Sequence, residues 1–163
     1  MGSARGAVRS VISNLSEEMR TMTKLTKSIT INAPVGDVFD HLKDPAKSWV
    51  DFTTKVRDIK PTPDGVGTTF VWESKVFGFH VTGTNEYTEV VPNRRLVVSA
   101  SRGFVFAFAL EPEGAGTLLT LAEEDVPSNW AAAAFDAVAM RLTEHDLDTW
   151  LTSVKTAVEG KSG

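Results

Sequence analysis

Residues 55–125 constrain the fold most strongly, because six strand-like segments follow one another there with only compact turns between them. The segments cover about residues 55–60, 68–76, 79–90, 95–101, 104–111 and 117–125. The turn signals between them are Pro63-Asp64-Gly65, Gly78, Pro92-Asn93, Arg102-Gly103 and the run 112–116. Short strands joined in this way pair consecutively and antiparallel. With the alternating segment that begins at Lys27, they predict a seven-stranded antiparallel sheet and exclude a doubly wound α/β fold.

The chain ends in a stretch, residues 128–158, that contains no proline or glycine and is predicted to form one long helix. Such a helix is long enough to cover the apolar face of the sheet. Its first half carries an apolar stripe, and six alanines lie between Ala131 and Ala139. Small side chains over a concave sheet predict unfilled space, although close packing of helix on sheet is the alternative. The second half carries a rotated stripe formed by Leu147, Trp150, Leu151, Val154 and Val158, which predicts a bend near residues 141–146.

Two short helices are predicted between the first strand and the meander. Ala33-Pro34 begins the first, whose buried stripe is Val35, Val38, Phe39 and Leu42 and leaves His41 on the solvent side. Asp44-Pro45 ends it. A second piece around residues 46–52 brings Trp49 and Phe52 toward the interior.

Alternation assigns the faces of the sheet. Phe104, Phe106, Phe108 and Leu110 share the inner face, and Val105, Ala107 and Ala109 share the outer one. In the long strand 79–90, Phe79, Val81 and Tyr87 are predicted to face inward, opposite His80, Thr82, Thr84, Glu86 and Thr88.

Residues 1–26 precede this domain, which we expect to span residues 27–160. The apolar residues of this segment have helical spacing, and it lacks the apolar core and cleavage site of a secretory signal, so we expect a cytoplasmic protein. The alternatives are an extra docked helix, an arm that grips a second subunit, and poorly ordered sequence upstream of a later start such as Met22. A mobile or loosely docked extension is favoured. A homodimer is a further expectation. It would form through such an arm or through the outer strip at Val105, Ala107 and Ala109.

Composition excludes several classes of function. The net charge is −4 with no Lys/Arg cluster, which argues against nucleic acid and anionic membrane surfaces as partners. No apolar run approaches the ~20 residues of a membrane-spanning helix. Cysteine is absent, and His41, His80 and His145 are scattered, so no metal site and no cofactor are expected.

The order of elements resembles the helix-grip α+β fold of the START-like (SRPBCC) superfamily, in particular its polyketide cyclase/dehydrase and lipid-transport branch. The likeness covers about residues 27–158 and lies in SITINAPVGDVFDHLKDPAKSWVDF, DGVGTTFVW, VVPNRRLVVSA and EGAGTLLTLAEE. It implies a curved sheet wrapped around the C-terminal helix, with an apolar pocket between them. Relatives use such pockets to bind lipids, sterols, polyketides, hormones or isoprenoid quinones, and some are aromatase/cyclases.

The resemblance and the alternation pattern together predict a set of pocket residues. They are Trp49, Phe52, Phe70, Trp72, Tyr87, Phe106, Phe108, Ala134, Phe135, Val138, Leu142 and His145. Two functions fit them: binding or carriage of a hydrophobic small molecule, which is favoured, and a polyketide cyclase or dehydratase acting in the same cavity. An inward titratable group with a hydrogen-bonded partner would favour the enzyme. Tyr87, His145 and Glu123 are the candidates for that group.

Overall fold

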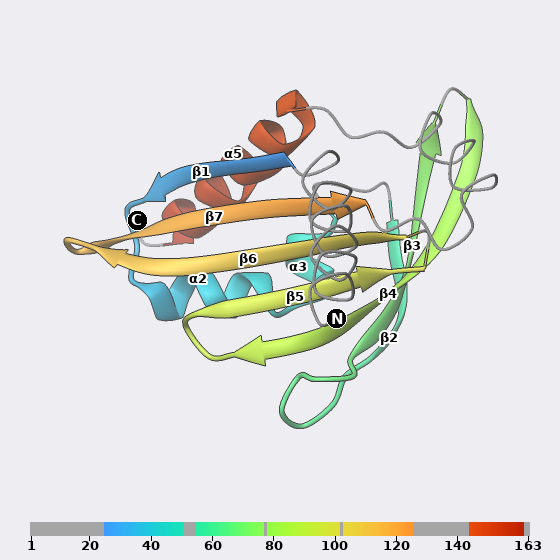
Figure 1. Cartoon of the computed structure of the whole chain (residues 1–163), viewed down its shortest axis with the longest axis horizontal. Helices are drawn as coiled ribbons and strands as arrows, with labels where there is room; N and C mark the ends of the chain where they lie inside the picture. Colours follow the sequence, from blue (N-terminus) through green and yellow to red (C-terminus); the bar gives the residue numbers. More distant parts are fainter. Residues whose placement is uncertain (1–24, 51–54, 77, 102, 126–143, 162–163) are drawn as a thin grey trace, which may run out of the picture.

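The computed structural model describes residues 25–50, 55–76, 78–101, 103–125 and 144–161. Within these ranges the chain forms seven strands and three helices (Figure 1). In chain order the elements are β1 (Leu25–Ile31), α2 (Val35–Leu42), α3 (Pro45–Ser48), β2 (Lys55–Lys60), β3 (Thr69–Val76), β4 (Phe79–Val91), β5 (Arg95–Ala100), β6 (Phe104–Glu113), β7 (Gly116–Asp125) and α5 (Glu144–Lys161).

The strands form one antiparallel sheet in the order β1-β7-β6-β5-β4-β3-β2. Strands β2 to β7 follow one another along the sheet as the meander predicts, and β1 completes it beside β7. The first strand begins at Leu25, two residues before the predicted boundary, because Leu25 is already paired with Glu123 of β7. The predicted α+β class with a seven-stranded antiparallel sheet is confirmed.

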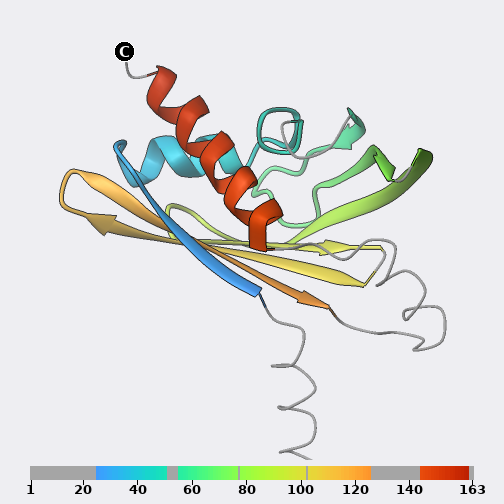
Figure 2. The same cartoon turned by 90° about the horizontal axis from the view of Figure 1, so that it is seen from above.

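All three helices of the described chain lie on one side of the sheet, which we call the inner face (Figure 2). Helix α3 begins at a capped end, since Oδ1 of Asp44 accepts a hydrogen bond from the backbone nitrogen of Ala46 at 3.1 Å. It ends at Ser48 and is shorter than predicted. Trp49, its C-cap residue, is buried as expected. Phe52 lies outside the described residues.

Helix α5 carries the second apolar stripe of the sequence toward the sheet. Its five residues are all buried: Leu147, Trp150, Leu151, Val154 and Val158. The predicted first half of the long helix lies outside the described residues, and so do Ala134, Phe135, Val138 and Leu142. No helix in the described ranges has the length and apolar character needed to cross a membrane.

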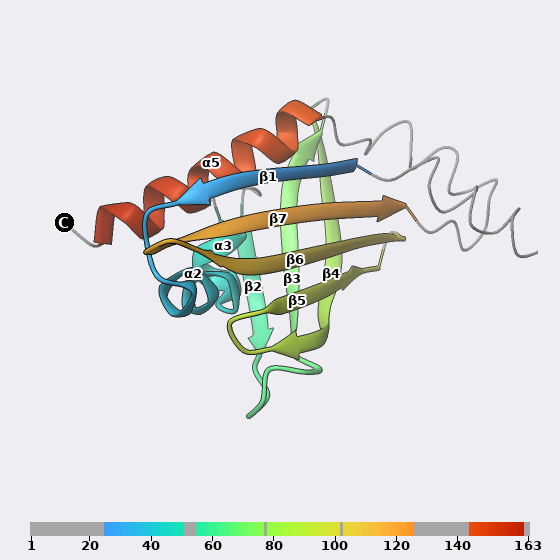
Figure 3. The same ribbon diagram turned by 60° about the vertical axis from the view of Figure 1, so that its left-hand side comes forward.

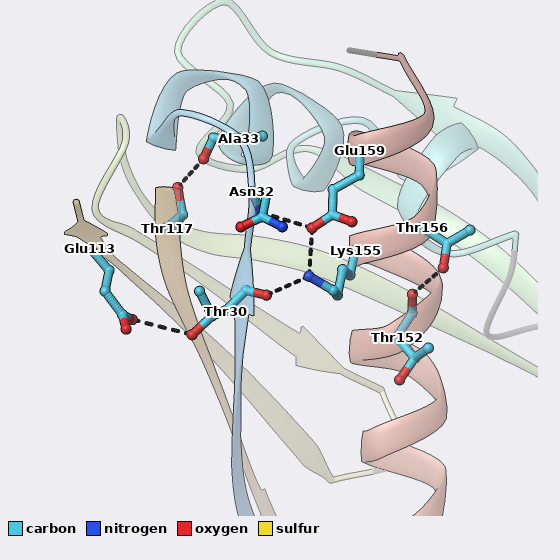
Figure 4. Close-up of polar contacts among 9 residues, drawn as sticks. All are labelled: Thr30, Asn32, Ala33, Glu113, Thr117, Thr152, Lys155, Thr156 and Glu159. Carbon is cyan, nitrogen blue, oxygen red and sulfur yellow. Dashed lines mark hydrogen bonds and ion pairs between the residues drawn. The ribbon is translucent and has the colours of Figure 1, made fainter. Parts of the chain in front are cut away.

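The C-terminal half of α5 runs beside β1 and is fixed to its end by polar contacts (Figures 3 and 4). Nζ of Lys155 donates to the carbonyl of Thr30 at 2.8 Å and also contacts Glu159. The Glu159 carboxylate accepts from the backbone nitrogen of Asn32 at 2.8 Å. These bonds join the helix to the end of the strand, and so the helix is held over the edge of the sheet formed by β1.

The alternation of faces holds over most of the sheet. On β6 the four predicted inner residues are buried, and Val105, Ala107 and Ala109 are half-buried on the outer face. His80, Thr82, Thr84, Glu86 and Thr88 are exposed, as predicted for the outer side of β4.

Two predicted orientations are wrong. Phe79 is 75% exposed, because it lies at the end of the β3–β4 hairpin, in the last pair of the ladder with Val76, where no described helix covers the sheet. His41 is only 4% exposed rather than solvent-facing. Helix α2 packs against α5, α3, β6 and β7, so more than one side of it is covered and the buried arc widens to include His41 together with Val38 and Leu42.

Candidate functional site

Seven aromatic residues form a continuous group on the inner face, which we call the aromatic cluster. Its members are Trp49, Phe70, Tyr87, Phe104, Phe106, Phe108 and Trp150. The Trp49 and Trp150 ring centroids are 4.6 Å apart, and Phe108 meets Trp150 edge-on at 5.2 Å. Such tilted and edge-to-face contacts are favourable arrangements of aromatic rings. Five of the seven were predicted as pocket residues, Phe104 was predicted on the inner face of its strand, and Trp150 was predicted on the second apolar stripe of the long helix.

Two polar atoms of the aromatic cluster, on Tyr87 and Trp150, bond to the main chain of the short helices. The indole nitrogen of Trp150 donates to the carbonyl of Ser48 at 3.1 Å. The Tyr87 hydroxyl donates to the carbonyl of Leu42 at 3.1 Å, and the Ser48 hydroxyl is within 3.1 Å of the same oxygen. The rings and these bonds tie α3 and α5 to the sheet, so this part of the inner face holds the fold together.

Burial raises the pKa of the Tyr87 phenol well above its ordinary value. The group is therefore protonated at neutral pH, and its proton is already donated to Leu42. Tyr87 therefore stabilises the end of α2 and is poorly suited to act as a general base.

A second group of residues lies on the inner face of β3 and β4. We call this group, Trp72, Gly83 and Asn85, the Trp72–Asn85 site. Trp72 and Gly83 are cross-strand partners, and a Cβ atom at Gly83 would lie 2.6 Å from the indole ring. Glycine thus lets the indole lie across β4, where its nitrogen donates to Oδ1 of Asn85 at 3.0 Å. The Asn85 side chain is buried, and its Nδ2 has no hydrogen-bond partner among the described residues.

The surroundings of Asn85 are apolar. Phe70 is its partner on β3 and Ala100 its partner on β5, and both are buried. Phe104, at the start of β6, is also buried on this face. An amide in such surroundings needs hydrogen-bond partners to offset the loss of water.

The structure places the predicted proton-transfer candidates in different surroundings. Glu123 is 4% exposed and faces inward on β7, opposite Phe106, so one of the acidic residues that end this strand does point inside. His145 is exposed, which corrects its expected place on the cavity floor. At 100° per residue it lies about 180° around α5 from the buried stripe, whose first member is Leu147. No group of three or more potential metal-ligating side chains occurs in the described part of the chain.

Sequence reasoning missed Asn85 although a signal for it was present. Alternation places Gly83 and Asn85 on the same face as Tyr87, but only apolar and aromatic residues were read as inward. A glycine paired with a tryptophan was the second signal, since it indicates a ring lying over the neighbouring strand.

Comparison with known proteins identifies the family. Residues 22–159 match the family described as polyketide cyclase / dehydrase and lipid transport. The chain belongs to this family. No curated protein sequence matches it closely enough to count as a relative.

Several solved structures share the fold of this chain. The Zhui aromatase/cyclase from Streptomyces sp. R1128 has a TM-score of 0.66 at 17% identity, with 86% of this chain and 95% of that chain covered. The protein TTHA0849 from Thermus thermophilus has a TM-score of 0.64 at 18% identity, with 86% and 99% covered. The di-domain ARO/CYC StfQ of the steffimycin biosynthetic pathway has a TM-score of 0.68 at 14% identity, with 99% of this chain and 62% of that chain covered. At these identities the likeness concerns the fold.

Proposed function

We propose that this protein binds a hydrophobic small molecule, such as a lipid, a polyketide or an isoprenoid, between the inner face of the sheet and the helices. The observation that carries the proposal is the aromatic inner face under the helices, in a chain of the polyketide cyclase/dehydrase and lipid-transport family. An apolar surface with few polar groups is typical of sites for apolar ligands. Membership of the polyketide cyclase/dehydrase and lipid-transport family supports a hydrophobic ligand of this class.

The part of the inner face around Asn85 is where we place the ligand. The Tyr87 hydroxyl and the Trp150 indole nitrogen are bonded to the chain itself, whereas the Asn85 amide keeps unused donors. Ala100, the neighbour of Asn85 on β5, has a small side chain.

An environment-sensitive apolar dye tests the proposal when it is titrated into the full chain and the same sample is then melted. We expect saturable binding near one dye per chain and an upward shift of the melting temperature, because a ligand that binds only the folded state stabilises it. Absence of binding to a cooperatively folded protein, together with an extract free of a co-purified apolar molecule, would refute the proposal.

Replacement of two alanines by phenylalanine, one on each face of the sheet, tests where the dye binds. Ala100→Phe enlarges a buried side chain on the inner face, and Ala107→Phe makes the same change at a half-buried residue of the outer face. We expect Ala100→Phe to abolish dye binding and Ala107→Phe to leave it intact. The melt of each variant checks that it is folded, since overpacking costs about 1–3 kcal/mol.

Catalysis on the bound molecule, as in a polyketide cyclase or dehydratase, is the second candidate, and Glu123 is the observation that favours it. A buried carboxyl group on an apolar face is a candidate for proton transfer. His145 is exposed and Tyr87 donates to Leu42, so two of the three expected groups are poorly placed and binding remains favoured. Turnover of a poly-β-ketone substrate that is lost in Glu123→Gln, with dye binding retained, would establish the enzyme.

A further inference from the structure

The orientation of the Asn85 side chain is fixed by its neighbour. The Trp72 indole nitrogen can only donate a hydrogen bond, so the amide atom 3.0 Å from it has to be the oxygen. The Asn85 nitrogen, with two N–H donors, therefore points away from Trp72. The lack of a side chain at Gly83 allows the indole to adopt this position.

These donors are buried without a partner. Asn85 is 1% exposed, and Nδ2 has no hydrogen-bond partner among the described residues. Two buried hydroxyl groups show the usual situation: the Thr117 hydroxyl donates to the Ala33 carbonyl at 2.7 Å, and the Thr68 hydroxyl accepts from the Thr62 nitrogen. A buried donor left unpaired is destabilising and calls for a partner from outside the chain.

The charge of the inner face restricts what that partner is. The buried polar and charged residues of the described chain are His41, Ser48, Thr68, Asn85, Thr117 and Glu123. Lysine and arginine are missing from this described set, so the buried surface offers neither of these cations to a ligand carboxylate or phosphate. Since a buried charge needs a counter-charge, an uncharged acceptor suits the site better than an anion.

We propose that Nδ2 of Asn85 donates a hydrogen bond to a neutral carbonyl oxygen, of the ketone or quinone type, on an otherwise apolar ligand. Trp72 is the positioning residue that turns the amide nitrogen toward the ligand. The aromatic rings of Phe70 and Trp72 beside the amide favour a flat ring system next to that carbonyl. This assignment rests on the proposed binding function and narrows its ligand class from lipids in general to apolar ketones.

Two flat probes of nearly equal size isolate the contribution of the carbonyl group to the binding affinity. Fluorenone carries a ketone, and fluorene carries a methylene group in its place. Dissociation constants for both are measured with the full chain, with Asn85→Leu and with Trp72→Phe. Thr117→Val is the matched control, because it removes a buried hydrogen bond at a different position in the sheet. Fluorene-9-carboxylate tests the preference against an anion.

We expect the preference for fluorenone over fluorene to fall by roughly threefold to tenfold in Asn85→Leu, which corresponds to the loss of one neutral hydrogen bond. The preference falls in Trp72→Phe as well, since the amide loses its orientation, and is unchanged in Thr117→Val. The carboxylate binds more weakly than fluorenone. The carbonyl stretching band of fluorenone bound to the wild-type protein moves to lower wavenumber than in an apolar solvent, and this readout needs no variant.

Different results overturn different claims. One result would overturn this inference alone: both probes bind, but the preference for fluorenone is the same in Asn85→Leu as in wild type, and the carbonyl band stays at its apolar-solvent position. In that case the amide does not contact the ligand. If the carboxylate binds more tightly than the ketone, the preference for a neutral acceptor is wrong. If neither fluorene nor fluorenone binds and the apolar dye also fails, the proposed function fails together with the inference.

Discussion

The indole nitrogen of Trp72 donates to Oδ1 of Asn85 across two neighbouring strands, over a residue that has no side chain. This bond fixes both groups on the inner face. It leaves the two N–H donors of the asparagine amide as the polar feature of an otherwise apolar region.

Gly83→Ala is expected to lower the free energy of unfolding by about 1–3 kcal/mol, because the new methyl group overlaps the Trp72 indole and the ring has to move. A Cβ atom there would lie 2.6 Å from the ring. Denaturant unfolding measures the change. Gly160→Ala in α5 is the control, since a Cβ atom there has no neighbour within 4 Å. It should raise stability by up to about 1 kcal/mol. Equal effects of the two substitutions would contradict the assigned position of the indole.

Trp150→Phe is expected to lower the free energy of unfolding by about 1–3 kcal/mol, because the Ser48 carbonyl loses its buried donor. The aromatic ring is retained, so the apolar packing against Phe108 and Trp49 is largely preserved. Chemical denaturation monitored by circular dichroism gives the change. An unaltered stability would mean that the bond between α5 and Ser48 does not contribute to folding.

Tyr87 is the single tyrosine of the chain, so an alkaline titration followed by phenolate absorbance reports on it alone. Burial raises its pKa in the folded state. Stability from this group is therefore full below the ordinary tyrosine pKa of about 10 and is lost as the pH rises above it. We expect the phenolate band to appear only together with alkaline unfolding. A reversible titration of the folded protein near pH 10 would show that the hydroxyl is accessible to solvent.

Glu159 couples the end of α5 to β1, and its pKa is held below the ordinary value by the hydrogen bond from Lys155 and then by that from the Asn32 backbone. A lowered carboxyl pKa adds stability that is present above the unfolded-state pKa and is lost as the pH falls through the folded-state pKa. We expect Glu159→Gln to melt below wild type at neutral pH, with the difference shrinking below about pH 4.3. Thermal melts over a pH series measure it, and a difference independent of pH would refute the electrostatic part of the contact.

The sequence was sufficient to predict the sheet, because its strands are marked by alternation and by glycine and proline turns. The segment predicted at 55–60 coincides with β2, and the others differ from the observed strands by a few residues. Gly114 and Ala115 are the residues between β6 and β7, where a longer turn over 112–116 was expected, because Pro112 still pairs with Thr117.

Side-chain environments were predicted less well where they depend on packing between elements. His41 is buried because several elements surround α2, and Phe79 is exposed because its hairpin ends beyond the helices; neither fact is encoded in local periodicity. His145 was placed by extending a stripe from residues before it, whereas the stripe of α5 begins at Leu147 on the opposite side. Asn85 was overlooked because a polar residue was assumed to face solvent.

The signals of the Asn85 side-chain amide and the Trp72 indole in a ¹⁵N-labelled NMR sample give the most direct test of ligand binding on the inner face. We expect fluorenone to shift both signals in a saturable manner and to leave the backbone amide of Ala107, a residue of the outer face, unchanged. Saturable binding that leaves the Asn85 and Trp72 signals in place would show that the ligand binds elsewhere and would refute the proposed site.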